Sequence, residues 1–185
     1  FKKVISNLLS KKYYRKVDKV VAVSNYTKNY LLEYYPETAQ KIKVITNGID
    51  LKKHKIIDPE KKPENQVKKI LFIGEVKKRK GVLEAIRACK FYKDNFSANF
   101  IYDIVGSYDK DDGYYQKALK EIKDYNLEGK VFFRGKVVDQ ELENYYLNAD
   151  LFMMTPININ NYFEGFGLVF LEANTKGVPC IGSTN

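Results

Sequence analysis

The feature that most constrains the fold is a regular alternation of short apolar runs with helical patterns over residues 70–183. Between the runs, apolar residues recur at helical spacing, as in Val82, Leu83, Ile86 and Cys89. Strands that alternate with helices favour a parallel sheet with helices on its faces. We therefore predict an α/β fold with a Rossmann-like parallel sheet flanked by helices. The predicted strands are Ile70–Gly74, Phe100–Gly106, Val131–Gly135, Asn148–Pro156 and Val178–Ser183.

The front of the chain is strongly basic, because residues 1–69 hold 17 Lys/Arg against 7 Asp/Glu. Within the first 16 residues, apolar side chains at helical spacing with lysines around them predict an amphipathic basic helix. Such a helix can contact an anionic membrane peripherally or pack on its own domain, and we expect packing. Lys52–Lys69 is polar and contains two prolines, which is the composition of a linker.

Composition excludes several classes of function. No run of 18 apolar residues predicts a membrane span, and His54 is the only histidine, so a His-based triad within this chain is excluded. Cys89 and Cys180 lie among apolar neighbours, and we expect both to be reduced and buried. No Cys/His cluster has metal-ligand spacing, and we expect no metal site.

A glycine turn near the end of the chain carries the strongest chemical signal. The stretch Glu164–Glu172 places two carboxylates eight positions apart, with Gly165 and Gly167 between them. These glycines allow close backbone approach, and a helix that starts near Leu168 would present free amides to an anion such as a diphosphate. Gly177 is expected to end this helix, which we predict from Gly167 to Lys176.

The pair of glutamates resembles the E-x7-E motif of the group 1 retaining glycosyltransferases, whose second domain binds a sugar-nucleotide donor. A strand, Ser24 or Asn25 as a helix cap, a second strand and then Asn47–Asp50 are similar to the end of the first domain in that family. The resemblance covers essentially the whole chain. It implies a partial GT-B architecture with the end of an N-terminal, acceptor-side domain (1–51), an inter-domain linker (52–69) and a donor domain truncated at its C-terminus (70–185).

A basic loop after the first donor-domain strand both matches and departs from the family pattern. The family commonly has Gly-Arg, four variable residues and Lys-Gly, and its Arg and Lys neutralise the donor diphosphate. Lys80 and Gly81 match, whereas Glu75 stands at the Arg position. Because a carboxylate cannot neutralise a diphosphate, either Arg79 or Lys78 supplies the second positive charge or donor affinity is weakened, and we expect Arg79 to supply it.

The resemblance also implies a role for each site residue. Glu164 would hold a donor-sugar hydroxyl and Lys80 the diphosphate, which makes these two the predicted catalytic residues, and Glu172 would hold the ribose hydroxyls. The loop Pro156–Phe163 is predicted to close over the donor. The complete predicted donor-binding set is Gly74, Arg79, Lys80, Val137, Glu164, Gly165, Phe166, Gly167, Leu168, Val169 and Glu172.

The function that the resemblance implies is transfer of a hexose, with retention of configuration, from a nucleotide-diphosphate sugar to a glycan or lipid-linked acceptor. We expect no cofactor and no essential metal, because helix amides and basic side chains would stabilise the leaving diphosphate. We expect a cytoplasmic bacterial enzyme of polysaccharide or cell-envelope biosynthesis, with peripheral contact of the basic helix with the inner membrane face as the alternative to its packing. The chain starts at Phe1, and we expect a fragment that is inactive alone.

Two alternatives stay open. The basic front and its tyrosines favour a non-catalytic module that binds polyanions or nucleic acid, although we expect no nucleic-acid partner. The second alternative is a GT-B relative that isomerises or phosphorolyses sugars.

Overall fold

The computed structural model describes residues 10–52, 56 and 66–184. The chain divides into two compact units, Phe1–Gly48 and Ile49–Asn185, and each is described by itself. The first nine residues of the predicted basic helix, most of the predicted linker and His54 lie outside the described residues.

The first unit contains a two-stranded parallel sheet and a capped helix. Strand β1 (Val20–Ala22) pairs in parallel with β2 (Ile42–Val44), and α2 (Asn25–Tyr34) connects them through a short 3-10 helix (Pro36–Thr38). The predicted cap at Ser24 is confirmed, because its side chain accepts a hydrogen bond of 3.0 Å from the Thr27 amide. Pro36 follows directly after the helix cap, where the restricted residue before a proline commonly ends a helix.

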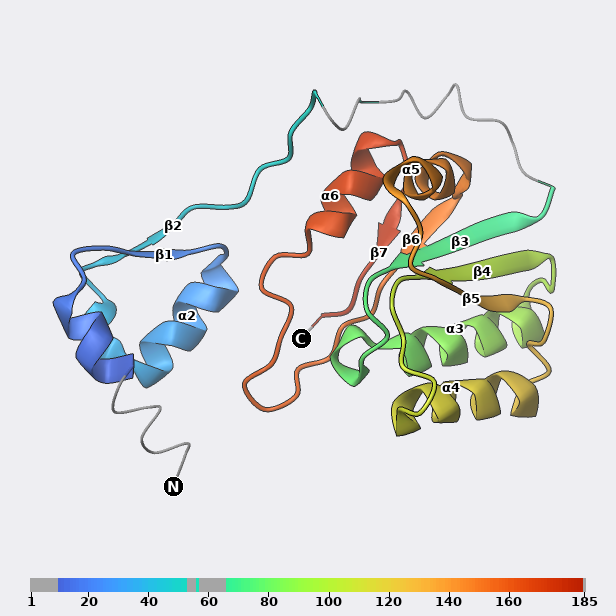
Figure 1. Cartoon of the computed structure of the whole chain (residues 1–185), viewed down its shortest axis with the longest axis horizontal. Coiled ribbons are helices and arrows are strands. Elements are labelled where there is room, and N and C mark those ends of the chain that lie inside the picture. Colours follow the sequence, from blue (N-terminus) through green and yellow to red (C-terminus); the bar gives the residue numbers. More distant parts are fainter. Residues whose placement is uncertain (1–9, 53–55, 57–65, 185) are drawn as a thin grey trace. The chain divides into compact units, whose positions relative to one another are not determined.

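The second unit is built on a five-stranded sheet in which every strand pair is parallel. Its elements are β3 (Lys68–Ile73), α3 (Val82–Asn95), β4 (Phe100–Val105), α4 (Gly113–Asp124), β5 (Val131–Gly135), α5 (Asp139–Asn148), β6 (Leu151–Met153), α6 (Leu168–Thr175) and β7 (Cys180–Ile181). The strand order is β5-β4-β3-β6-β7. Figure 1 shows α3 and α4 on one face of the sheet and α5 and α6 on the other. The predicted Rossmann-like α/β fold is therefore confirmed.

The strand order contains one reversal, and it lies between β3 and β6. From β3 the chain moves outward through β4 to β5, and it then returns to the other side of β3 to form β6 and β7. In open parallel sheets the loops that leave the carboxyl ends of the strands on either side of such a reversal diverge and leave a crevice for ligands. The loops after β3 and β6 are therefore the place to look for a site.

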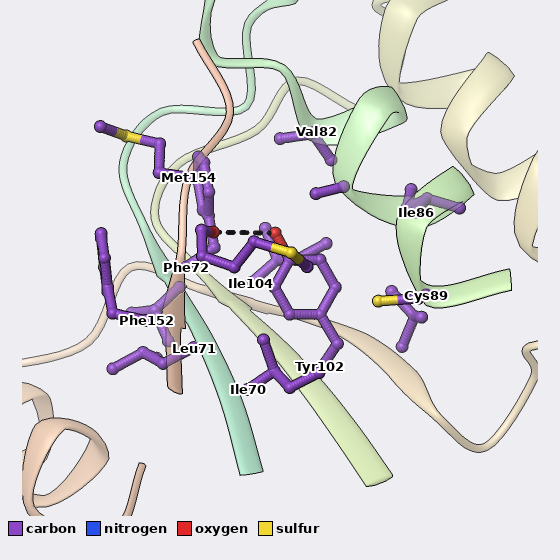
Figure 2. Close-up of a cluster of buried hydrophobic side chains, with 14 of the residues drawn as sticks. Ile70, Leu71, Phe72, Val82, Ile86, Cys89, Tyr102, Ile104, Phe152 and Met154 are labelled. Atoms are coloured by element: carbon purple, nitrogen blue, oxygen red, sulfur yellow. Dashed lines mark hydrogen bonds between the residues drawn. The ribbon is translucent and has the colours of Figure 1, made fainter. Parts of the chain in front are cut away.

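The core of this unit explains why its strands read as continuous apolar runs. A sheet covered on both faces buries the residues of both faces, and Phe72, Tyr102 and Phe152 are among the largest fully buried side chains. Figure 2 shows Phe72 and Tyr102 on the side of the sheet that faces Val82, Ile86 and Cys89 of α3. The Phe152 ring packs on the other face, against Tyr146 of α5 and Phe170 of α6. The Tyr102 hydroxyl donates to the Met153 carbonyl at 3.3 Å, which satisfies its one buried polar group.

Asp139 is the first residue of α5, where its charge favours the helix dipole, and Val138 precedes it as the N-cap. One expectation about a single residue is wrong. Cys180 is only partly buried, whereas Cys89 is buried as expected. Both thiols are free, and burial raises the pKa of Cys89 to about 12 and that of Cys180 to about 11. Neither thiol is a thiolate at neutral pH.

Candidate functional site

The loop after β3 is fixed against the loop after β6 by a close backbone contact. Gly81 has a φ of 70°, and a Cβ on it would lie 1.6 Å from the carbonyl oxygen of Thr155. The Thr155 hydroxyl donates to the Gly81 carbonyl at 2.8 Å, and the Ile157 amide donates to the Arg79 carbonyl at 3.0 Å. Only glycine permits this approach, so the basic loop and the β6 loop hold a defined spacing.

Three charged side chains from these two loops converge on one point. Arg79 and Lys80 lie in the 3-10 helix Lys78–Lys80, directly before Gly81. Lys80 Nζ contacts Glu164 Oε2, and Arg79 Nη1 lies 3.5 Å from the same oxygen. The side chains of Lys80 and Glu164 are 13% and 19% exposed, and that of Arg79 is 36% exposed. The structure thus brings together residues 84 and 85 positions apart.

Helix α6 begins at its N-cap, Gly167, which lies three residues after Glu164 and has a left-handed backbone conformation. Gly167 caps the helix with φ 76° and ψ 63°, and a Cβ on it would lie 2.7 Å from the Phe170 ring. The Phe170 ring in turn packs edge-on against Phe152, with their centroids 5.2 Å apart. The first amides of a helix lack intrahelical acceptors, so Leu168 and Val169 present N–H groups at its positive end. Gly165 and Phe166 form the partly exposed turn between Glu164 and this helix.

Glu172 lies one turn into α6 and faces a different neighbour. Its Oε2 accepts a hydrogen bond of 2.7 Å from the hydroxyl of Tyr146 on α5, whose side chain is buried. Burial, and next the hydrogen bond to Glu172, raises the pKa of Tyr146 above its usual value, so the phenol stays a donor. Both residues line a pocket of about 250 Å³. Its other lining residues are Asp139, Gln140, Leu142, Glu143 and Lys176.

The remaining predicted site residues lie at the ends of the neighbouring strands. Gly74 follows β3, and its amide donates to the Val105 carbonyl at 2.9 Å. Val137 lies in the loop after β5 and packs, partly buried, against the core. Glu75 is half exposed and pairs with Lys77 at 3.4 Å rather than with Arg79 or Lys80.

The loop predicted to close over a donor has an internal structure. Ile159 and Tyr162 form an antiparallel bridge with two hydrogen bonds of 2.9 Å, and Asn160 takes a positive φ of 54° at the turn. The Ser183 hydroxyl donates to the Pro156 carbonyl at the start of the loop. The loop is therefore a small hairpin that is tied to the sheet at its base.

Three residues that the sequence did not single out for the site contribute to it. Thr155 sets the spacing of the two loops, and Tyr146 orients Glu172. Lys176 is only 2% exposed and pairs with Glu143 at 2.6 Å, in the same pocket as Glu172. Their partners lie 26 to 74 positions away, so no local pattern marks them.

Two absences among the described residues bear on the chemistry of the site. Within residues 10–52, 56 and 66–184, no group of three or more His, Cys, Asp or Glu side chains could hold a metal ion. In the same part of the chain, no helix has the length and apolarity that a membrane crossing requires.

A doubly wound parallel sheet that gathers two cations, a carboxylate and a helix start at its point of reversal is a Rossmann-like domain, a fold in which ligands bind at that point. The family model described as glycosyl transferases group 1 matches residues 53–185, and the one described as glycosyltransferase family 4 matches residues 1–53. The chain belongs to the group 1 glycosyltransferases.

Several known proteins are similar to this chain over most of its length. An uncharacterized glycosyltransferase of Methanocaldococcus jannaschii is 28% identical over 180 residues, which are 95% of this chain and 43% of that protein. The amylovoran biosynthesis glycosyltransferase AmsK of Erwinia amylovora is 29% identical over 147 residues, 78% of this chain and 34% of AmsK. The crystal structure of Anabaena HepE with UDP-glucose has a TM-score of 0.75 at 18% identity, over 95% of this chain and 48% of HepE. The chain spans less than half the length of each.

Proposed function

We propose that this chain is the donor-binding part of a retaining glycosyltransferase, which transfers a hexose from a nucleotide-diphosphate sugar to a glycan or lipid-linked acceptor. The single observation that carries the proposal is the convergence of Lys80 and Arg79 on Glu164, three residues before a helix start. Two cations, a helix N-terminus and a carboxylate are together the chemistry that a diphosphate-linked sugar requires.

The diphosphate would lie between the basic loop and the start of α6. Lys80 and Arg79 would pair with its oxygens, and the amides of Leu168 and Val169 would donate to them at the positive end of the helix. As the bond between sugar and phosphate breaks, negative charge accumulates on the leaving diphosphate. These fixed cations and amides would stabilise it without an essential metal or a cofactor.

The two glutamates would hold the two ends of the donor. Glu164 would accept hydrogen bonds from sugar hydroxyls and orient the anomeric carbon, on the turn formed by Gly165 and Phe166. Glu172 would accept from the ribose hydroxyls with Tyr146 as its fixed second donor. The base would then lie near Val137, in the loop after β5, and the hairpin Pro156–Phe163 would cover the sugar.

The names of the similar proteins suggest which donor and which acceptor class to test first. HepE has been crystallised with UDP-glucose, which makes UDP-glucose the first donor to test. AmsK is named for amylovoran biosynthesis, and a polysaccharide of a bacterial envelope is the corresponding acceptor class here. We place the enzyme in the cytoplasm, with peripheral contact to the inner membrane face through the basic front of the chain.

Calorimetry against UDP, GDP and ADP and their glucose and mannose esters tests the proposal. We expect one base to be preferred and Lys80→Met to weaken that donor roughly 10-fold to 100-fold, the range for a lost charge-assisted hydrogen bond. Lys78→Met is the matched control, because Lys78 lies exposed in the same 3-10 helix.

Equal losses for both lysine variants would mean only a general attraction of anions. Binding of single-stranded nucleic acid with a steep salt dependence, and no response to any sugar nucleotide, would favour the polyanion-binding alternative. Product analysis of transfer against isomerisation or phosphorolysis separates the other alternative.

A further inference from the structure

The site contains an anion of its own, the carboxylate of Glu164. Of the ion pairs among the described residues, those of Lys80 and Arg79 are both made with Glu164, and with the same oxygen, Oε2. The carboxylate is mostly buried between the two loops, so its charge is only partly screened by water. Any diphosphate that pairs with Lys80 and Arg79 must displace this carboxylate or share the cations with it.

A sugar nucleotide and a nucleoside diphosphate differ in what they offer the displaced carboxylate. The sugar of the donor carries hydroxyl groups that can donate to Glu164 once it has left the cations. A nucleoside diphosphate carries no hydroxyl groups beyond its terminal phosphate, and that free phosphate adds to the negative charge facing Glu164. When the donor binds, new hydrogen bonds from its sugar therefore compensate for the ion pairs that Glu164 loses. When the nucleoside diphosphate product binds, nothing compensates for them.

From this asymmetry we infer that Glu164 is an internal counter-ion that competes with the nucleoside diphosphate product for Lys80 and Arg79 and so selects the sugar-bearing donor over it. The inference rests on the proposed function and adds to it a specificity role and a route for product release. After transfer the sugar hydroxyls are gone, Glu164 returns to the two cations, and the diphosphate loses its partners.

The basic loop offers a matched control for charge. Glu75 lies in the same loop, and its carboxylate pairs with Lys77 at 3.4 Å rather than with either cation of the site. Glu75→Gln removes one negative charge near the site, as Glu164→Gln does, without freeing Lys80 or Arg79. Any difference between the two variants therefore reports the specific contacts of Glu164.

The test measures the affinities of the wild-type protein and both variants for inorganic pyrophosphate, for UDP, GDP and ADP, and for the corresponding sugar nucleotides. We expect Glu164→Gln to bind pyrophosphate and the preferred nucleoside diphosphate about threefold to tenfold more tightly, as expected for release of a partly buried ion pair. The same variant should bind the sugar nucleotide more weakly, while Glu75→Gln changes the three ligands in parallel.

Each other outcome has a defined meaning. Unchanged or weaker pyrophosphate binding in Glu164→Gln overturns the inference, and so does an equal gain in Glu75→Gln, which would be a general effect of charge. If the wild-type protein binds no sugar nucleotide, the proposed function fails. A pyrophosphate gain confined to Glu164→Gln would then still support the counter-ion, so the two failures are distinguishable.

Discussion

Glu164 and Glu172 belong to one motif, yet the structure places them in opposite electrostatic surroundings. Glu164 faces two cations, Lys80 and Arg79, which come from the loop after β3. Glu172 faces a neutral donor, the hydroxyl of Tyr146, which comes from α5. One carboxylate is therefore held by charge from across the sheet reversal, and the other by a directional hydrogen bond between two helices on the same face.

This difference indicates which glutamate moves on ligand binding and which does not. An ion pair is exchangeable, because another anion can take the place of the carboxylate beside the same cations. A hydrogen bond from a buried phenol with a raised pKa has no such competitor and fixes the acceptor. We therefore expect Glu164 to respond to the ligand and Glu172 to form a rigid part of the pocket.

The largest loss of stability should follow from a substitution at Gly81, where the loop that carries Lys80 contacts the loop that carries Glu164. Gly81→Ala places a Cβ 1.6 Å from the Thr155 carbonyl oxygen at a positive φ, so the two loops must separate. Backbone strain and overpacking each cost about 1–3 kcal/mol, and we expect unfolding in urea to show a loss of about 3 kcal/mol or more.

The matched control is Gly113→Ala, because Gly113 starts α4 and a Cβ there meets no atom within 4 Å. It should be neutral or slightly stabilising. If Gly81→Ala were as stable as Gly113→Ala, the contact that holds Lys80 opposite Glu164 would not exist in solution.

An intermediate effect is expected from Tyr146→Phe, which removes the hydroxyl that donates to Glu172 and keeps the ring. Loss of a buried hydrogen bond to a charged acceptor should cost about 1–2 kcal/mol of unfolding free energy. Tyr146→Phe should also weaken the binding of nucleoside diphosphates and of sugar nucleotides by the same factor, because both ligands contain the ribose. Tyr145→Phe, one position away on α5, is the control, and a sugar-dependent effect of Tyr146→Phe would contradict the division of roles between the glutamates.

How far the sequence predicted this site depends on where each partner lies. The strands and helices were predictable because a sheet covered on both faces requires continuous apolar runs. The approach of Lys80 to Glu164, 84 positions apart, was also predictable, since the loops after parallel strands meet at one sheet edge. Topology thus supplied a long-range contact that no local pattern contains.

The contacts that were missed depend on side-chain packing between elements. Tyr146 has the spacing of an ordinary core residue on its helix, and nothing local distinguishes it from Tyr145. Thr155 looks like the end of a strand, and its contact with Gly81 follows only from the observed spacing of the two loops.

The smallest effect is the change in stability of Glu164→Gln. It distinguishes the two glutamates most directly, because salt screens an ion pair more than a hydrogen bond from a neutral donor. Glu164→Gln should change the unfolding free energy by less than about 1 kcal/mol, since the Gln carbonyl can still accept a hydrogen bond from Lys80 and the contact with the more exposed Arg79 is weak. Raising NaCl from roughly 0.1 M to 1 M shortens the Debye length from about 10 Å to about 3 Å, and it should reduce that small change further. The cost of Tyr146→Phe should stay constant over the same range, because its donor is neutral. A parallel decline in both variants would show that the two carboxylates share one electrostatic environment.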